Sequence, residues 1–384
     1  MIGIDVGATQ VTLSTNDEVA TFPISAPPQL AHLIAQDLPH IELSGAGCEL
    51  TSAADAFAQI VRDTLDSMHL KRSRHDGDEE TASVALAVPG WWSPDAVQRV
   101  RIALNDQEVR ALVVNDAEAA VAGWSEERAQ LPEAVAVVSL RNHEASVVLV
   151  EDCNARARAL LSPTFAHDEG GDFLDTTVLQ HLIAGLRDMN QPIDVETDEV
   201  ISAAREALPQ CRELRETLSL SAAESIHLEL PGNAKTVRVV RGELEELAAP
   251  WLDAVLANLG DAISQSPRPI KSVLLVGGLA SMPLVSQRVS AELGLDVSVP
   301  SQPREVVARG ARILLDQHIQ ASATWRDTWK NWASRFQRRR SSKTAPVNLR
   351  SRLRSTGEGL QFFLGFEAGL REKLLVNHRG GNNK

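Results

Sequence analysis

The sequence predicts an α/β fold whose sheets are strongly buried. Along the first 320 residues, stretches rich in β-branched and apolar residues alternate with stretches of helical spacing. Apolar runs such as ASVALAVPG (residues 82–90) lack the polar alternation of a half-exposed strand, which indicates sheets covered on both faces. A chain of 384 residues is long enough for two or three packed lobes.

The first half of the chain predicts a hairpin, a helix, and two buried strands, the second of which runs into a helix. The hairpin turns at Gly7, and Ser52 is a plausible N-cap for the helix because its hydroxyl can accept a backbone hydrogen bond. A charged loop separates the helix from the first of the two buried strands, which Pro89 and Gly90 close. In order, the elements are the hairpin 1–15, the helix 52–68, the loop 70–81, the strand 82–90 and the strand–helix 109–124.

The second half repeats this logic. The predicted elements are the hairpin 134–151, the helix 174–186, the helix–strand 211–230, the long amphipathic helix 241–263 and the strand–turn–helix 271–293. The order of hairpin, strand–helix, hairpin and strand–helix indicates a duplicated plan. The second hairpin is unusual because its turn, from Arg141 to Glu144, contains no glycine.

The charge of the chain is divided unevenly. From Ala321 onward there are 14 Lys/Arg against 4 Asp/Glu, whereas the preceding 320 residues hold 24 Lys/Arg against 47 Asp/Glu. An acidic folded body with a basic appendage is therefore expected, and the body does not suit nucleic-acid binding. No apolar stretch approaches the ~20 residues that span a bilayer. The widely spaced Cys48, Cys153 and Cys211 and the absence of a basic stretch before the first apolar run favour a reducing cytoplasm.

Seven segments carry a resemblance to a known family. They are MIGIDVGATQ (1–10), LAVPGWW (86–92), VVNDAEAAVAGW (113–124), CRELRETLSLS (211–221), RGELEEL (241–247), VLLVGGLASMPLV (273–285) and QPREVVARGAR (302–312). In this order they resemble the nucleotide-binding domain of the Hsp70 chaperones, within the actin, Hsp70 and sugar-kinase superfamily.

The resemblance implies the actin/Hsp70-like ATPase fold, in which two lobes surround a central cleft and each is built on a ribonuclease-H-like mixed sheet with flanking helices. It places the nucleotide-binding domain at 1–318, with lobe I at about 1–128 plus 300–318 and lobe II at about 129–299. Residues 319–384 then form a basic amphipathic C-terminal segment, too short for the peptide-binding domain of an Hsp70 chaperone.

The resemblance also implies a site for ATP or ADP with Mg²⁺. In the first phosphate loop, Gly7 lets backbone N–H groups approach phosphate, Thr9 adds a hydroxyl, and Asp5 can orient a water on Mg²⁺. The alternative is a hairpin that merely needs glycine and a turn-forming aspartate. The residues expected to bind nucleotide are Asp5, Gly7, Ala8, Thr9, Gln10, Arg215, Ser219, Gly277 and Gly278.

Adenine recognition departs from the family pattern. Arg215 and Ser219 match the adenosine-contacting lysine and serine, but Arg212, Glu216 and Ser281 replace a glutamate and two arginines. The turn at Gly277 and Gly278 can seat a nucleotide near a helix N-terminus, or can simply be a strand–helix turn that needs positive φ.

The second phosphate loop departs furthest. Where the family reads Asp-Leu-Gly-Gly-Gly-Thr-Phe-Asp, this chain reads SLRNHEAS (139–146), so three glycines are bulky residues and the metal-orienting aspartate is Ser139. Glu144 brings negative charge to the place of phosphate, which Arg141 or His143 can offset. The first lobe is also short, and Lys71 is a poor substitute for the family's catalytic lysine. Hydrolysis is expected to be lost.

Two hypotheses follow, together with a weaker third one. The first is an Hsp70-like protein that retains ATPase or chaperone activity, with Asp5 as a candidate catalytic residue. The second is a degenerate pseudo-ATPase that acts as a scaffold. The third is a sugar kinase with Asp116 as the catalytic base, although the Gly-Thr-Gly phosphate turn of those kinases and the Cys/His zinc site that some of them carry are missing.

The C-terminal segment predicts an aromatic helix face with basic flanks. Its members are Trp325, Trp329, Trp332, Phe336, Arg338, Arg339 and Arg340. This composition is typical of a helix at an anionic membrane surface, such as the inner face of the membrane, and also suits a protein partner or docking onto the body. Nucleic acid is disfavoured because no base-reading module lies beside the arginines. A second short amphipathic stretch follows from residue 360.

Overall fold

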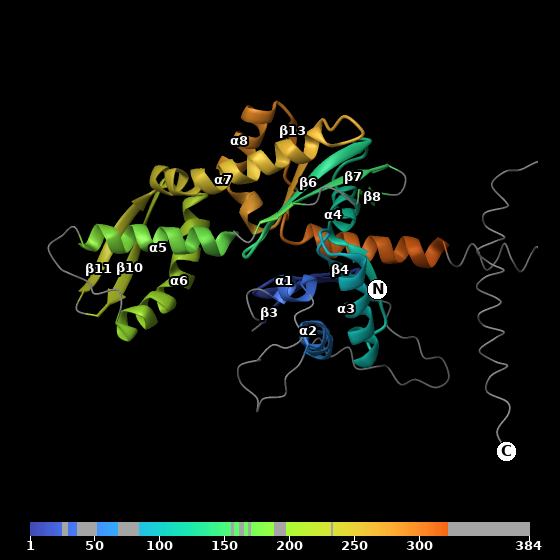
Figure 1. Cartoon of the computed structure of the whole chain (residues 1–384), viewed down its shortest axis with the longest axis horizontal. Coiled ribbons are helices and arrows are strands. Elements are labelled where there is room, and N and C mark those ends of the chain that lie inside the picture. The colour runs from blue at the N-terminus through green and yellow to red at the C-terminus, as the bar shows by residue number, and fades with distance from the viewer. Residues whose placement is uncertain are drawn as a thin grey trace, which may run out of the picture. The chain divides into compact units, whose positions relative to one another are not determined.

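The computed structural model shows two large sheets with flanking helices and a separate two-stranded sheet (Figure 1). It describes residues 1–24, 30–36, 52–67, 84–154, 157–160, 165–167, 170–187, 197–231 and 233–321. All of these belong to one compact unit, Met1–Ala321, whereas the second unit, Ser322–Lys384, lies outside the described residues.

The N-terminal sheet has the strand order β3-β2-β1-β4-β5. Its strands are β1 (Ile2–Val6), β2 (Gln10–Ser14), β3 (Val19–Pro23), β4 (Val84–Val88) and β5 (Ala111–Asn115). β2 is antiparallel to both β1 and β3, whereas β4 is parallel to both β1 and β5. Every residue of β4 is buried, as its unbroken apolar sequence predicts.

The central sheet repeats this topology as β13-β12-β6-β7-β8. Its strands are β6 (Ala134–Leu140), β7 (Ala145–Glu151), β8 (Arg158–Ala159), β12 (Ser272–Val276) and β13 (Asp296–Ser298), and β9 (Phe165–His167) also pairs with β7. The β6–β7 hairpin is antiparallel, and β12 lies parallel to both β6 and β13. The duplicated plan is thus present in the strands, and β6–β7 occupies the place that β1–β2 has in the N-terminal sheet.

Two helices fill the space between the sheets. They are α4 (Asp116–Trp124) and a closing helix that covers residues 306–321. Their alanine and valine side chains form one buried cluster with strands of both sheets. The helices approach so closely that a Cβ on Gly310 would lie 1.6 Å from the carbonyl oxygen of Ala119. This contact requires glycine, and it fixes where α4 begins relative to both hairpins.

The outer face of the N-terminal sheet is covered by α1 (Leu30–Ala35), α2 (Ala53–Ser67) and α3 (Pro94–Asp106). Ser52 caps α2 as expected, because its Oγ accepts a hydrogen bond from the Asp55 amide at 3.1 Å.

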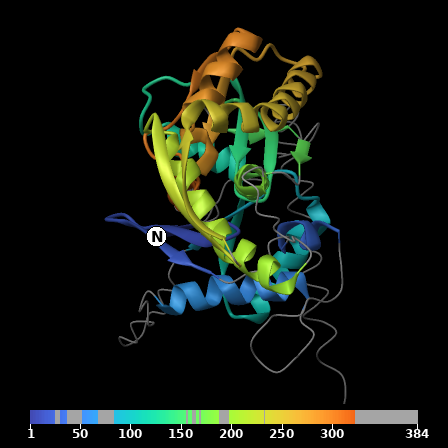
Figure 2. The same cartoon turned by 90° about the vertical axis from the view of Figure 1, so that its left-hand side faces the viewer.

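The central sheet carries a larger helical layer. Its elements are α5 (Gly171–Arg187), α6 (Asp198–Leu218), α7 (Arg241–Ser264), the short 3₁₀ helix η1 (Gly278–Ser281) and α8 (Pro283–Leu293). The hairpin of β10 (Ala223–Leu230) and β11 (Asn233–Val240) extends this layer beside α6 (Figure 2).

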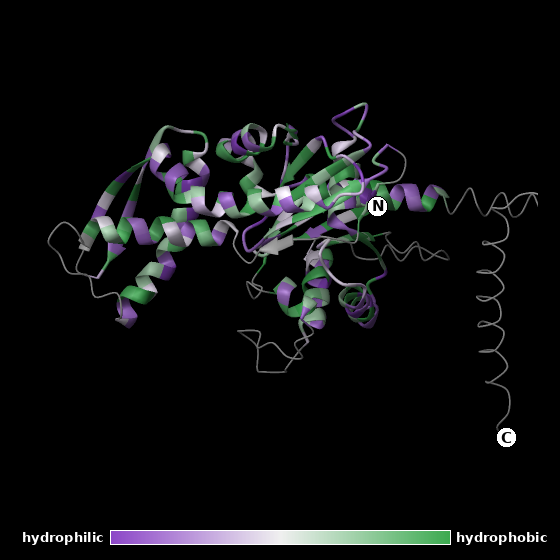
Figure 3. Ribbon diagram, turned by 45° about the horizontal axis from the view of Figure 1, so that its top comes forward, coloured by the Kyte–Doolittle hydropathy of each residue, from purple (hydrophilic) through white to green (hydrophobic). Residues whose placement is uncertain are grey.

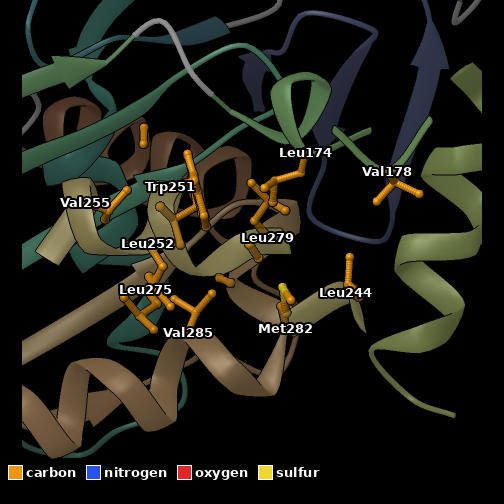
Figure 4. Close-up of a cluster of buried hydrophobic side chains, with 14 of the residues drawn as sticks. Leu174, Val178, Leu244, Trp251, Leu252, Val255, Leu275, Leu279, Met282 and Val285 are labelled. Carbon is orange, nitrogen blue, oxygen red and sulfur yellow. The ribbon is translucent and has the colours of Figure 1, made fainter. Parts of the chain in front are cut away.

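Apolar residues concentrate in the central sheet and the inward faces of these helices (Figure 3). Figure 4 shows part of this core, in which Leu252 and Val255 of α7 belong to one cluster with Leu275 of β12. Full burial of each such side chain stabilises the fold by about 1.5–3 kcal/mol.

The structure confirms the α/β class, both hairpins and the expected order of helices. It adds elements that the sequence did not predict: α1, α3, β3, β8, β9, β11 and β13. Most of these are short or half-exposed, so their apolar pattern is weak. The charged loop 70–81 with Lys71, and all the aromatic and basic residues expected in the C-terminal segment, lie outside the described residues.

Candidate functional site

The turns of the two equivalent hairpins face each other across a cavity of about 130 Å³. Residues from β1, β2, β12, α6 and the segment before the closing helix complete its walls. The lining residues are Asp5, Gly7, Ala8, Thr9, Gln10, Thr12, Ser139, Arg141, Asn142, Arg212, Glu216, Val276, Gly277, Gly278, Pro303, Arg304 and Val307.

Most of the predicted nucleotide-binding residues meet at this cavity. Asp5, the run from Gly7 to Gln10, and the Gly277–Gly278 pair all line it. Arg215 and Ser219 do not. The Ser219 hydroxyl donates to the Arg215 carbonyl oxygen at 3.0 Å, and the Arg215 guanidinium is 4% exposed and bonds to Asp175 at 2.7 Å. The hydrogen bonds of both side chains are therefore used within the protein.

Arg141 is the central residue of the site. Its Nη1 donates to Asp5 Oδ1 at 3.0 Å, and its Nη2 donates to Asp116 Oδ2 at 3.2 Å. Its Nε donates to Ser139 Oγ at 3.2 Å, and the nearest Glu144 oxygen lies 4.0 Å from that nitrogen. Sequence reasoning paired Arg141 only with Glu144. The fold instead places one guanidinium among three carboxylates, at the position where a nucleotide-binding site would hold metal and phosphate.

Burial and charge oppose each other within this cluster. Burial raises the pKa of Asp116 to about 6, and the nearby charge of Arg141 acts against that rise. The pKa of Glu144 is likewise raised by burial and held back by Arg141. Burial alone would lower the pKa of Arg141, but the charges of the three carboxylates raise it above its usual range. Arg141 is therefore the fixed cation of the site.

Asp116 has no free oxygen facing the cavity. Its Oδ1 accepts the Gly90 amide at 2.8 Å, its Oδ2 accepts Arg141, and the side chain is 4% exposed. It stands at the first residue of α4, just after Asn115, whose side chain caps the helix. A general base needs an oxygen within reach of a substrate hydroxyl, so this geometry does not suit Asp116 to that role.

The backbone of the second turn is bound from behind by the start of α5. The Gly171 amide donates to the Arg141 carbonyl oxygen at 3.0 Å, and the Asp172 amide donates to that of Asn142 at 2.8 Å. The first amides of a helix are common anion-binding donors. Here these two amides are already bonded to the turn.

A chain of ion pairs continues from the turn into α5 and α6. His143 contacts Asp172, Arg212 bonds to Asp172 at 2.5 Å and to Asp175 at 3.2 Å, and Arg215 completes the pairing of Asp175. Burial would raise the pKa of Asp172, but His143 and Arg212 lower it overall. Sequence reasoning missed Asp172 and Asp175: Asp175 lies on the predicted helix 174–186, but Asp172 lies before its start. Arg212 and Arg215 lie three residues apart on one face of the next predicted helix.

The Gly277–Gly278 turn is covered by a second ion pair. Gly277 has φ 94°, a conformation that favours glycine. Beside Gly278, a Cβ would lie 3.1 Å from Arg304 Nε, and Arg304 Nη2 bonds to Glu216 Oε1 at 2.6 Å. The sequence indicated Arg304 only as part of the segment 302–312, whereas in the fold its side chain lines the cavity.

A nucleotide with Mg²⁺, the group typical of the Hsp70 fold, does not fit these residues as they stand. The cavity is smaller than the roughly 300–1,000 Å³ of ordinary ligand pockets. Asp5, which would orient a metal-bound water, instead accepts a hydrogen bond from Arg141. Among the described residues, no three His, Cys, Asp or Glu side chains form a metal-binding group.

Two equivalent hairpins that face a cleft between two lobes define the class: the chain has the actin/Hsp70-like fold. The model of a family described as "Hsp70 protein" matches residues 42–322, which is more than half of the chain. The chain therefore belongs to the Hsp70 family, as a divergent form of its nucleotide-binding domain.

Three similar relatives are all heat shock protein homologs of fungi. The one from Eremothecium gossypii is 26% identical over 274 residues, which is 66% of this chain and 38% of the relative. The one from Lachancea kluyveri is 24% identical over 270 residues, with the same shares. The one from Saccharomyces cerevisiae is 25% identical over 283 residues, which is 70% of this chain and 39% of the relative. The matched part thus spans less than two fifths of these relatives.

Proposed function

We propose that the chain is a non-hydrolysing scaffold of the Hsp70 family, which joins a protein partner or a membrane surface through its basic C-terminal segment. The observation that carries this proposal is the position of Arg141, whose guanidinium bonds to both Asp5 and Asp116. The protein partner is part of this proposal, which starts from the chain's membership of the Hsp70 family.

The chemistry of phosphoryl transfer explains why Arg141 matters. Catalysis rests on cations and backbone donors placed around the transferring group. In this chain Asp5, the carboxylate that would orient a water on Mg²⁺, is neutralised by Arg141, and Ser139 takes the place of a metal-orienting aspartate. The glycine cradle is replaced by side chains, of which Asn142 bonds to Thr9 at 3.1 Å. These contacts favour loss of turnover.

Phosphate release from ATP and Mg²⁺ by the full chain tests the proposal. Release is expected at the level of the buffer control, and calorimetry is expected to detect at most weak binding of ATP. The matched variant is Asp5→Ala, because Asp5 is the residue through which metal would be held. Turnover that this substitution abolishes would contradict the proposal.

An active Hsp70-like ATPase is the second candidate. It is favoured by the gathering of Asp5, Gly7, Thr9 and the Gly277–Gly278 pair around one cavity. The same phosphate-release measurement separates it from the scaffold. Phosphorylation of a sugar with Asp116 as base has less support, because both oxygens of that carboxylate are bonded inside the protein.

The C-terminal segment carries the recruiting part of the proposal, on sequence grounds alone. None of the described helices is long and apolar enough to cross a membrane. The aromatic face and basic flanks of the segment suit a peripheral association from the cytoplasm, at the inner face of the membrane. Co-sedimentation with anionic liposomes is expected, and it should fall when Trp325, Trp329 and Trp332 are changed to Ala but less when they are changed to Phe. Equal binding to neutral liposomes, or no binding to anionic ones, would contradict the proposed binding to an anionic membrane. The protein partner would then be the proposal that is kept.

A further inference from the structure

We infer that arginine-centred bridges hold the cleft of this chain closed without any ligand, so that its closed conformation is set by its own side chains. The inference rests on the proposed non-hydrolytic role of the same cleft. It adds that the conformation is independent of nucleotide, and that the turn from Arg141 to Glu144 is the part that closes it.

The first bridge is Arg141 itself. It belongs to the β6–β7 turn of the central sheet, and its two partners belong to the other lobe. Asp5 is on β1, and Asp116 follows β5 at the start of α4. One rigid, forked side chain thus joins two elements across the cleft. A guanidinium presents parallel donors to two carboxylates without a change of protonation, which makes it a durable substitute for a bound cation.

Two further contacts also cross the cleft. Asn142 Nδ2 donates to Thr9 Oγ1 at 3.1 Å, which ties the tips of the two equivalent turns together. Arg304 pairs with Glu216 of α6 at 2.6 Å. Arg304 precedes the closing helix, which packs on β1: a Cβ at Gly3 would lie 2.0 Å from the Ala308 carbonyl oxygen.

The buried bridge is expected to dominate. The Arg141 side chain is 14% exposed and its partners Asp5 and Asp116 are 12% and 4% exposed, whereas Arg304 and Glu216 are 44% and 39% exposed. Charge-assisted hydrogen bonds are stronger where water is excluded, and exposed ion pairs add little. Arg141 and its partners Asp5 and Asp116 therefore make the strongest contact across the cleft, which we call the lock. The Arg304–Glu216 pair is a weaker contact at the rim.

The turn from Arg141 to Glu144 is also bonded to the start of α5, which connects the lock to that helix. The Gly171 and Asp172 amides bond to its carbonyl groups, and His143 contacts the Asp172 carboxylate. A movement of Arg141 out of the carboxylate cluster would pull on this helix start. The state of the cleft is in this way coupled to the layer formed by α5 and α6.

Hydrogen exchange of the full chain, without nucleotide, tests the lock. Arg141→Ala is expected to speed amide exchange about tenfold or more in residues 3–10, 139–146 and 171–174. The matched control is Arg268→Ala. Arg268 also contacts two carboxylates, those of Glu151 and Asp152, but neither contact crosses the cleft. Addition of Mg²⁺ and ATP to the unaltered chain is expected to add no protection in these segments.

Unchanged exchange in Arg141→Ala would overturn the inference, and so would strong added protection by Mg²⁺ and ATP. If Arg141→Ala does not fold, as judged by circular dichroism, the double variant Asn142→Ala with Arg304→Ala decides. It is expected to speed exchange in residues 7–10, where the bond from Asn142 to Thr9 is lost, and unchanged exchange there would overturn the inference. This measurement does not depend on phosphate release. If the exchange results are as expected but the chain hydrolyses ATP, only the proposed function is contradicted.

Discussion

The β1–β2 turn and the β6–β7 turn occupy the same place in two sheets of the same topology, yet their chemistry differs. The first keeps the small residues of a phosphate loop, with Gly7 and Ala8 at its tip. The second presents Arg141 and Asn142, which reach across and bond to Asp5 and Thr9. Buried strands maintain the topology of both hairpins, while the few turn residues decide what each can bind.

Their glycines show the same contrast. Gly7 needs no positive φ, and a Cβ there would meet only the Gln10 carbonyl oxygen, at 3.0 Å. The second turn has no glycine of its own, but Gly170 lies against it. A Cβ on Gly170 would lie 2.4 to 2.6 Å from the Arg141 and Asn142 carbonyl oxygens and the Glu144 amide. Glycine leaves space in the first turn and permits close packing under the second.

The largest expected effect comes from removal of the cation between the turns. Arg141→Ala leaves Asp5, Asp116 and Glu144 close together without the fixed cation between them, and breaking such a buried pairing costs about 3–5 kcal/mol of unfolding free energy. Chemical denaturation at pH 7.5 measures it. Arg268→Ala should cost less than about 1 kcal/mol because that arginine is exposed. Equal losses in the two variants would show that Arg141 has no special position.

The second effect is a pH dependence of the free energy of unfolding, which differs in sign between Asp116 and Asp172. The raised pKa of Asp116 means that the folded state holds its proton more tightly than the unfolded chain does. Its contribution to stability is therefore complete below about pH 3.8 and is lost as the pH rises through about 6. Arg141, Asp5 and Glu144 face the same group and shape this titration.

Asp116→Asn removes that titration. Relative to the unaltered chain, the variant should become more stable as the pH rises from 4.5 to 7.5, by about 2 kcal/mol. Asp172→Asn is the matched control with the opposite sign, because the pKa of Asp172 is lowered and its contribution is lost as the pH falls. Denaturation curves at several pH values measure both. If the stability of the two variants changed with pH in the same direction, the raised pKa of Asp116 and the lowered pKa of Asp172 could not both be right.

The smallest effect separates the two glycines. Gly170→Ala should destabilise the fold by about 1–3 kcal/mol, since backbone atoms on the second turn cannot move aside. Gly7→Ala should cost less, because only one carbonyl oxygen must shift slightly. Thermal unfolding of both variants gives the difference. A larger loss for Gly7→Ala would mean that the first turn, too, is closely packed.

Much of the fold followed from local pattern. The unbroken apolar runs of β4, β6, β7 and β12 predicted buried strands, and Ser52 predicted the start of α2. The short edge strand β13 and the half-exposed β11 escaped because their patterns are weak. Most of the predicted nucleotide-binding residues meet at one cavity because turns of equivalent hairpins face each other.

The sequence by itself determined the α/β class, the repeated hairpins and the loss of the glycine cradle from the second loop. Only the tertiary structure decided the partners of Arg141, which are 136 and 25 residues away along the chain. A side chain brings its charge and donors from the sequence, but its partners depend on how two sheets pack around α4. That packing turned a glycine-poor turn into a bridge across the cleft.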